Sequence, residues 1–427
     1  MKLNASKIII PLLCFYLVMG IHLLDSSLES ILRVFRLMTV PVLIFIILAL
    51  APKIRLVQAK RLSWLGLPII ILFLINLLQL VVLPKDVIEM HITGSIRFTA
   101  WFGTYLCALF SLNPSSAFDY KKNILKVLLI VFLIGVFIYP FIMLGSGVSL
   151  STVLAGYGDS ADRVQNSGIF GSANEDANGL MTIFPIALFF LEQMKGIKKT
   201  IFKWILFSFF PFLLLYNGTR TTLFFTLPII LVVFYSKLSL KGLIRLALIV
   251  AVPIGFTLPF ISSFMNQAFA SQASGDGGSF TWRVDYVWTP AIEYTQKYSP
   301  IFGFGSRGWE YVAQQLSLFI NNSGRTEDII STHSGYVWTF ISWGGVGFCT
   351  YILFLVVLLI ESFRLSQLQN KESQILGRAL FCSVFGYCTW AYISNVMYSQ
   401  GWVILISLAT LIAATKISIY SDYKRSK

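Results

Sequence analysis

The chain has few charged residues for its length. Only 12% of its 427 residues are Asp, Glu, Lys or Arg, whereas 56% are hydrophobic and phenylalanine alone occurs 37 times. A typical soluble domain has about 25% charged residues, so this composition argues against an ordinary water-soluble globule. The sequence therefore indicates a membrane protein.

Cysteine, histidine and the common catalytic motifs are also scarce. The five cysteines form no CxxC and no pairing with the three histidines, which argues against a disulfide framework or a zinc site. The chain has no GxxxxGK[ST], HExxH, GxSxG or DxD pattern. These absences speak against ATP as an energy source and against a metal-held nucleotide sugar. The sequence predicts neither a metal nor a cofactor.

Long apolar runs recur from one end of the chain to the other. A stretch of roughly 17 to 25 apolar residues can cross a bilayer as a helix. The expected spans lie near 8–24, 37–51, 63–84, 92–113, 124–145, 178–194, 199–216, 220–236, 241–262, 335–360, 379–396 and 400–416. We therefore expect an all-α integral membrane protein with about 12 transmembrane helices, folded as one polytopic domain over residues 1–427.

The charges are distributed unequally between the two sides of the expected spans. If the N-terminus is inside, 23 of the 33 basic residues but only five of the 19 acidic residues lie on the inner side. An excess of Lys and Arg in short cytoplasmic loops is the positive-inside rule. Both termini are thus expected to be cytoplasmic, and the net charge of +14 reflects topology, with no nucleic acid as partner.

Two outer loops are long, at about 146–177 and 263–334. The second separates the ninth and tenth spans, and its later part predicts two amphipathic helices around a Gly-rich turn, forming a small cap. Residues 303–308, GFGSRG, match the dinucleotide pattern GxGxxG. That pattern needs a strand, a helix and a ribose-binding acid in a βαβ unit, which an outer loop does not offer. A turn is the better interpretation.

Several arginines lie on the outer side, of which Arg163, Arg220 and Arg283 are candidates for binding a substrate. Arg220 falls in a very short connection at the mouth of a helix. A guanidinium held there can bind a phosphate with two parallel hydrogen bonds. The alternative is that each arginine reaches the interface and contacts lipid headgroups. We favour a diphosphate site for Arg220 and Arg283 together.

His333 lies where the second long loop meets the tenth span, in ISTHSGYVWTFISWGG, residues 330–345. Ser331 or Thr332 is the expected helix N-cap, which would place His333 in the first turn, where the helix dipole disfavours a protonated imidazole. A neutral imidazole can accept a proton as a general base. The alternative is a histidine that caps or packs the helix. Tyr336, Trp338 and Trp343 fit an interfacial aromatic belt as readily as a sugar platform.

These stretches resemble the O-antigen ligase and polymerase family of bacterial surface-polysaccharide assembly. NGTRTTLFF (217–225) is similar to the family's Gly-Ser-Arg start of a helix, and RVDYVWTPAIEYTQKYSPIFGFGSRGWE (283–310) resembles its Arg-to-Gly-x-Gly block. GIFGSANEDANGL (168–180) looks like its stretch that ends in Asn before a span. THSGYVWTF (332–340) looks like its His-Asn-x-Tyr motif, with Ser334 in place of Asn.

The resemblance implies a metal-independent glycosyltransferase in the bacterial inner membrane, with its site and the large loop on the periplasmic side. It would transfer a glycan from undecaprenyl diphosphate to a sugar hydroxyl by inverting displacement. By position, Arg220 and Arg283 would bind the donor diphosphate, Arg163 would help to hold the donor, and His333 would activate or orient the acceptor. Membrane lipids are implied partners, with a chain-length regulator or a flippase as further ones.

Three functions remain open at this point. The first is a polymerase that joins lipid-linked repeat units of O-antigen or capsule. The second is a ligase that transfers finished polysaccharide to the lipid A core, using the same donor site. The third is a transporter or flippase of lipid-linked glycan. Transporters place ionisable groups and broken helices near the membrane midplane, whereas here the polar residues gather in outer loops.

Overall fold

A computed structural model describes residues 6–19, 56–145, 173–216, 222, 226–235, 283–320, 328–329, 332–394, 396 and 401–425. The expected spans at 37–51 and 241–262 lie outside these residues. So do two of the candidate arginines, Arg163 and Arg220.

The described residues are almost entirely helical. The α-helices are α1 (Ser6–Met19), α3 (Leu56–Val82), α4 (Lys85–Ser111), α5 (Pro114–Gly145), α8 (Ala173–Gln193), α9 (Gly196–Trp204), α10 (Phe210–Tyr216), α11 (Leu227–Tyr235), α14 (Thr289–Tyr298), α15 (Gly308–Gln315), α16 (Gly335–Ser366), α17 (Lys371–Ile393) and α18 (Gly401–Arg425). Two π-helices, η2 (Ile205–Phe209) and η4 (Arg283–Trp288), run directly into α10 and α14. Short strands β1 (Phe319–Ile320) and β2 (Asp328–Ile329) pair antiparallel.

Helices occupy every expected span that falls within the described residues. Three helical segments among them are long and apolar enough to cross a membrane, at Trp64–Val82, Gly335–Ser366 and Gly401–Ile419. The chain is therefore a helical, multi-pass membrane protein. The number of twelve spans and the cytoplasmic side of the termini stay predictions.

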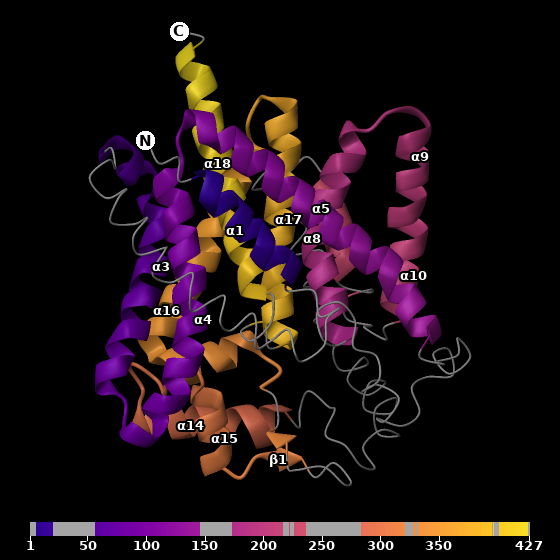
Figure 1. Cartoon of the computed structure of the whole chain (residues 1–427). Coiled ribbons are helices and arrows are strands. Elements are labelled where there is room, and N and C mark those ends of the chain that lie inside the picture. Colours follow the sequence, from indigo (N-terminus) through magenta and orange to yellow (C-terminus); the bar gives the residue numbers. More distant parts are fainter. Residues whose placement is uncertain are drawn as a thin grey trace, which may run out of the picture.

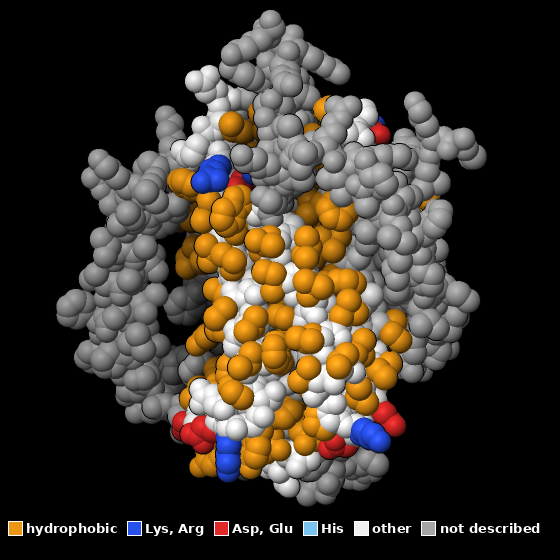
Figure 2. Space-filling view, turned by 90° about the vertical axis from the view of Figure 1, so that its left-hand side faces the viewer, with side chains coloured by type: hydrophobic (Ala, Val, Ile, Leu, Met, Phe, Trp, Pro, Cys, Tyr) orange, Lys and Arg blue, Asp and Glu red, His pale blue; other side chains and the backbone are white. Residues whose placement is uncertain are grey.

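One face of the bundle carries a broad apolar surface. Figure 2 shows hydrophobic side chains over the middle of this face, with charged side chains near its two ends. Helices α3 and α16 expose large apolar side chains, including Leu74 and Val81 on α3 and Leu353 and Val356 on α16. Apolar side chains exposed in a continuous band are stable against lipid tails but not against water.

The two ends of the bundle differ in content. The start of α1 and the end of α18 lie at one end, which we call the termini end (Figure 1). Helices α14 and α15 and the pair β1–β2 gather at the opposite end, which we call the loop end (Figure 1). Helices α14 and α15 lie on either side of residues 299–307, so the prediction of two helices around a Gly-rich turn is confirmed.

Large aromatic side chains fill the interior behind the loop end. Trp338 and Trp343 are fully buried, with ring centroids 5.4 Å apart. Phe98 of α4 and Trp402 of α18 contact Trp343 at 5.0 and 5.9 Å between centroids. Aromatic pairs in such tilted arrangements add to the stability gained by burial. The expectation that Trp338 and Trp343 form an interfacial belt or a sugar platform is therefore wrong, because other rings cover both.

Helix α16 is not continuous. Gly344 has φ 64° and ψ −168°, which divides the helix into a short first part, 335–343, and a long second part. An L-residue with a side chain is strained at such a φ, so glycine suits this position. The expected tenth span, 335–360, is thus a kinked element, and the GGVG stretch at 344–347 begins at the break.

Candidate functional site

Arg283 begins the π-helix η4, which continues as α14. Isolated π-helical turns are frequent at functional sites because they change which way the following side chains face. At the other end of η4, the Trp288 indole Nε1 donates a hydrogen bond of 2.6 Å to the carbonyl oxygen of Thr332. This bond joins the segment of Arg283 to the residue before His333. The structure thus brings two of the predicted site residues into one region.

His333 lies just before α16 and not in its first turn. The N-cap is Ser334, whose Oγ accepts a hydrogen bond of 3.4 Å from the Val337 backbone N–H. The prediction that Ser331 or Thr332 caps the helix is therefore wrong. Ser and Asn are both favoured N-caps, so Ser334 can supply the cap that Asn would supply in the related motif.

The backbone of His333 is also unusual, with φ 48°. A non-glycine residue in the left-handed region carries strain and is held by its surroundings. Here the surroundings are the Trp288–Thr332 bond on one side and the cap of α16 on the other, where the Gly335 N–H donates to the carbonyl oxygen of Ser394 at 3.0 Å.

The imidazole of His333 is neutral near pH 7. Its burial, and second the positive charge of Arg283, lower its pKa to about 4. The sequence predicted a neutral imidazole for another reason, the helix dipole. The tertiary structure supplies a different cause, because a buried cation beside a second cation is unfavourable. Burial also lowers the pKa of Arg283, whose guanidinium stays charged.

A third group of polar residues lies at the start of α8. Asp176 and Asn178 are buried, and the Asn178 side-chain oxygen accepts a hydrogen bond of 2.6 Å from Thr222 Oγ1. In the sequence, Thr222 follows Arg220 by two residues. Glu175, which precedes the expected span, has its pKa raised to about 7 by burial.

Helices α8 and α17 place this group at the depth of His333. A Cβ added to Gly386 of α17 would lie 3.4 Å from the Thr182 Cα of α8. The helices are antiparallel (Figure 1), so seven residues further, about 10 Å at 1.5 Å per residue, the two reach Glu175 and Ile393. Ile393 precedes Ser394, the partner of Gly335. The start of α8 therefore belongs to the same end of the bundle as His333.

Sequence reasoning did not name Glu175, Asp176 or Asn178 among the candidate site residues. The signal was present, because ANEDANG puts two acids and two amides directly before an apolar run. The sequence did not show which residues lie next to these side chains in the folded chain. Within the described residues, no three His, Cys, Asp or Glu side chains come together as a metal site would require.

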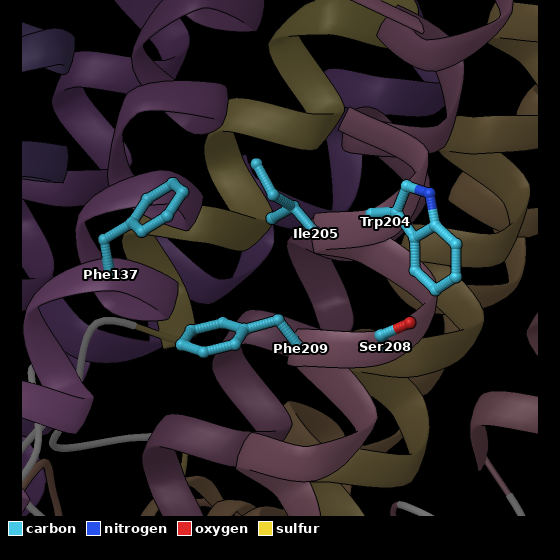
Figure 3. Close-up of a pocket in the computed structure, with 5 residues that line it drawn as sticks. All are labelled: Phe137, Trp204, Ile205, Ser208 and Phe209. Carbon is cyan, nitrogen blue, oxygen red and sulfur yellow. The ribbon is translucent and has the colours of Figure 1, made fainter. Parts of the chain in front are cut away.

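A cavity of about 450 Å³ lies elsewhere, between α5 and η2 (Figure 3). It is lined by Phe137, Trp204, Ile205, Ser208 and Phe209. The rings of Phe137 and Phe209 are 6.3 Å apart. No charged side chain lines it, so it offers nothing to hold a diphosphate, and we place the polar chemistry at His333 and Arg283 instead.

Comparison with known protein families agrees with this location. Residues 205–352 match the family described as O-antigen ligase. The matched region is about a third of the chain and includes Arg220, Arg283, the Gly-rich turn, His333 and the break in α16. A search of curated proteins gave no match. Over residues 205–352, the chain is similar to the family described as O-antigen ligase.

Proposed function

We propose that the protein is a glycosyltransferase of the inner membrane that transfers a glycan from undecaprenyl diphosphate to a sugar hydroxyl, with its site facing the periplasm. The observation that carries the proposal is the placement of Arg283 beside His333 at the loop end, within the region that matches the O-antigen ligase family. A cation beside a neutral imidazole suits a reaction in which one group binds a leaving diphosphate and the other contacts a hydroxyl.

The proposed reaction is a single displacement at the anomeric carbon of the donor. The acceptor oxygen forms a bond to this carbon, the bond from the carbon to the diphosphate oxygen breaks, and the electron pair leaves with undecaprenyl diphosphate. Arg283 and Arg220 stabilise the negative charge that develops on the diphosphate. Arg163 helps to hold the donor. The activated diphosphate supplies the energy, so the reaction needs no ATP.

His333 orients the acceptor hydroxyl and accepts its proton. In the free protein, burial and the charge of Arg283 keep the pKa of His333 low. A bound diphosphate brings at least one more negative charge than Arg283 neutralises, which removes the repulsion between Arg283 and a protonated imidazole. The pKa of His333 therefore rises when the donor binds, and the imidazole becomes a stronger base in the complex than in the free protein.

The acceptor decides between two reactions. A repeat-unit polymerase transfers the growing chain to another lipid-linked repeat of O-antigen or capsule. A ligase transfers the finished polysaccharide to the lipid A core, and the description of the matched family favours this second candidate. Both reactions use the same donor site. The polymerase, which is the reaction expected from the sequence, therefore stays a candidate beside the ligase.

A reconstituted assay tests the proposal. Purified protein in liposomes, without an ion gradient, is given a defined glycan on undecaprenyl diphosphate, and the products are separated by size. We expect elongated lipid-linked glycan for a polymerase and modified lipid A core when that acceptor is supplied to a ligase. Movement of unmodified glycan across the bilayer, with no glycosidic bond formed, would instead identify a transporter.

Two variants test the assigned roles in the same assay. His333→Ala should lose most of the transfer rate. Arg220→Lys keeps the charge but loses the two-pronged geometry of the guanidinium, so it should retain only part of the rate. Near-normal transfer by both variants, at normal protein levels, would mean that the residues have been given the wrong roles.

A further inference from the structure

The Gly-rich turn, residues 299–307, inserts into the break of α16. At the break, the N–H groups of Gly345 and Val346 do not donate to the carbonyls of Ile341 and Ser342, as they would in a continuous helix. Helical groups without partners are costly inside a membrane protein. The turn supplies partners for all four.

The partners are backbone groups on both sides of the break. The N–H groups of Phe304 and Gly305 donate to the carbonyls of Ile341 and Ser342 at 2.9 and 2.8 Å. In the other direction, Gly345 and Val346 donate to the carbonyls of Pro300 and Ile301 at 2.8 and 3.3 Å. Four hydrogen bonds therefore join the turn to the two sides of the break.

The approach is so close that glycine is required on both sides. A Cβ at Gly303 would lie 2.5 Å from the Gly344 backbone nitrogen, and a Cβ at Gly344 would overlap the carbonyl group of Ile301. Both glycines also have positive φ, 66° and 64°. In the GxG of the turn, Gly303 thus allows contact between two backbones, whereas Gly305 lies against the side chains of His91 and Leu83.

Two buried polar side chains from the α3–α4 hairpin hold the turn in place. Gln79 of α3 donates from its amide nitrogen to the Phe302 carbonyl on the turn and, at 2.7 Å, to the Ser342 carbonyl at the break. His91 of α4 accepts from the Ser306 N–H on Nδ1 at 2.9 Å, which leaves the proton on Nε2 to be donated to the Asn76 carbonyl at 3.0 Å. Both side chains are fully buried.

The turn connects the two proposed site segments at a distance from the site. From Arg283, the chain runs through η4 and α14 into the turn, and from His333 it runs through the first part of α16 into the break. The Trp288–Thr332 bond joins the same two segments again at their other end. The stretch from Trp288 to the turn and the stretch from Thr332 to the break are therefore joined to each other at both ends, and Arg283 and His333 lie at the Trp288–Thr332 end.

We propose that His91 is a positioning residue, which fixes the placement of Arg283 against His333 by holding the Gly-rich turn in the break of α16. An effect of His91 on the transfer rate rests on the proposed function, whereas its effect on the placement of Arg283 does not. The test therefore needs a measurement of that placement which is independent of activity.

Histidine NMR provides this measurement. The chain has three histidines, His22, His91 and His333, so labelled imidazole signals can be assigned by substitution. Arg283→Gln first shows how far the titration midpoint of His333 rises when the charge of Arg283 is removed. His91→Leu should then raise the midpoint in the same direction, because the released turn lets Arg283 move away. His91→Asn, whose Oδ1 can accept from the Ser306 N–H, should leave the midpoint near that of the unaltered protein.

A second variant guards against a misfolded His91→Leu protein. Gly94→Ala places a Cβ 2.5 Å from Ser306 Oγ and pushes the turn away from α4 with His91 unchanged, so it too should raise the midpoint. If His91→Leu or Gly94→Ala lowers the thermal unfolding temperature but leaves the His333 midpoint unchanged, both residues are merely structural and the inference is overturned.

Activity adds a separate outcome. In the transfer assay, His91→Leu should lower kcat about tenfold or more with a smaller change in KM for the donor, and His91→Asn should restore most of kcat. Were the unaltered protein to form no glycosidic bond at all, the proposed function would fail, while the NMR result would still decide whether His91 positions Arg283.

Discussion

At the termini end, charged side chains join neighbouring helices, whereas at the loop end the Gly-rich turn meets α16 through backbone groups and meets α3 and α4 through neutral side chains. Lys121 of α5 meets Glu372 of α17 at 2.9 Å, and Lys416 of α18 meets Glu361 of α16 at 2.6 Å. The loop end also has a π-helix, a broken helix and two non-glycine residues with positive φ, Ser317 and His333.

The difference shows where geometry matters most. Ion pairs between long side chains tolerate shifts of a helix, because the side chains can follow. Backbone groups that are hydrogen-bonded across a glycine contact cannot adjust when a helix shifts. They therefore fix the position of the two segments relative to each other. A site that must hold a cation, an imidazole and two substrates needs such fixed positions. Four experiments test this contrast, in order of decreasing expected effect.

The largest effect should come from the proposed donor site at the loop end. Arg283→Ala should lower kcat/KM for transfer by roughly 100- to 1000-fold, the usual loss when one group that stabilises developing charge is removed. Lys199→Ala at the termini end is the matched control, since its contact with Glu192 is long, 3.8 Å, and partly exposed. Equal losses in the two variants, measured as initial rates, would remove the functional contrast between the ends.

Next comes the stability of the contact between backbones. Gly344→Ala should destabilise the protein by about 3 kcal/mol or more, because it adds left-handed strain and forces the turn off its hydrogen bonds. Gly196 at the termini end has a similar φ of 62° but no heavy atom within 4 Å of an added Cβ. Gly196→Ala should therefore cost only about 1 kcal/mol. Thermal unfolding in detergent compares them, and similar losses would contradict the role of the turn.

At the termini end, the loss of stability on removing an ion pair should depend on how deeply the carboxylate is buried. The Glu361 side chain is 7% exposed and contacts both Lys416 and Arg364, whereas the Glu372 side chain is 56% exposed. Glu361→Gln should lower the free energy of unfolding by about 1–3 kcal/mol, since it weakens two contacts in a shielded place. Glu372→Gln should cost less than about 1 kcal/mol. A Glu361→Gln loss as large as that of Gly344→Ala would show that ion pairs fix the bundle as firmly as the glycine contact.

The smallest effect should be a displacement of pH profiles. His333 must be unprotonated to act, and its pKa in the free protein is about 4, so this group should limit kcat/KM only below about pH 5. With donor bound, the diphosphate raises this pKa, so the acidic fall of kcat should begin at higher pH. Glu175→Gln serves as the control, because the raised pKa of Glu175, about 7, would otherwise add its own titration. Coincident profiles in that variant would argue against diphosphate beside Arg283.

The sequence predicts much of the fold because membrane spans have a simple signature. Length and hydropathy placed helices at every expected span that the described residues include, and the loop sequence predicted α14 and α15 around the turn. The predictions were wrong where the local structure depends on residues that are distant in the sequence. Ser334 caps α16, and neither Ser331 nor Thr332 does. The helix breaks at Gly344, where the Gly-rich turn supplies hydrogen bonds that hydropathy does not register.

The candidate site was predicted in part. His333 and Arg283 were named from their residue types and side of the membrane, and the structure brings them together, while Arg163 and Arg220 lie outside the described residues. Glu175 and Asn178 were missed because their depth follows from the packing of α8 on α17. His91 gave no signal, since only the folded chain places Ser306 against it.

The sequence by itself determined that this is a helical membrane protein, because transfer of apolar side chains from water to lipid depends on composition and spacing alone. Only the tertiary structure decided that His333 is neutral through burial beside Arg283, and that a Gly-rich turn completes a broken helix. Those outcomes depend on hydrogen bonds and charges between residues far apart in the chain, and such distances exist only after folding.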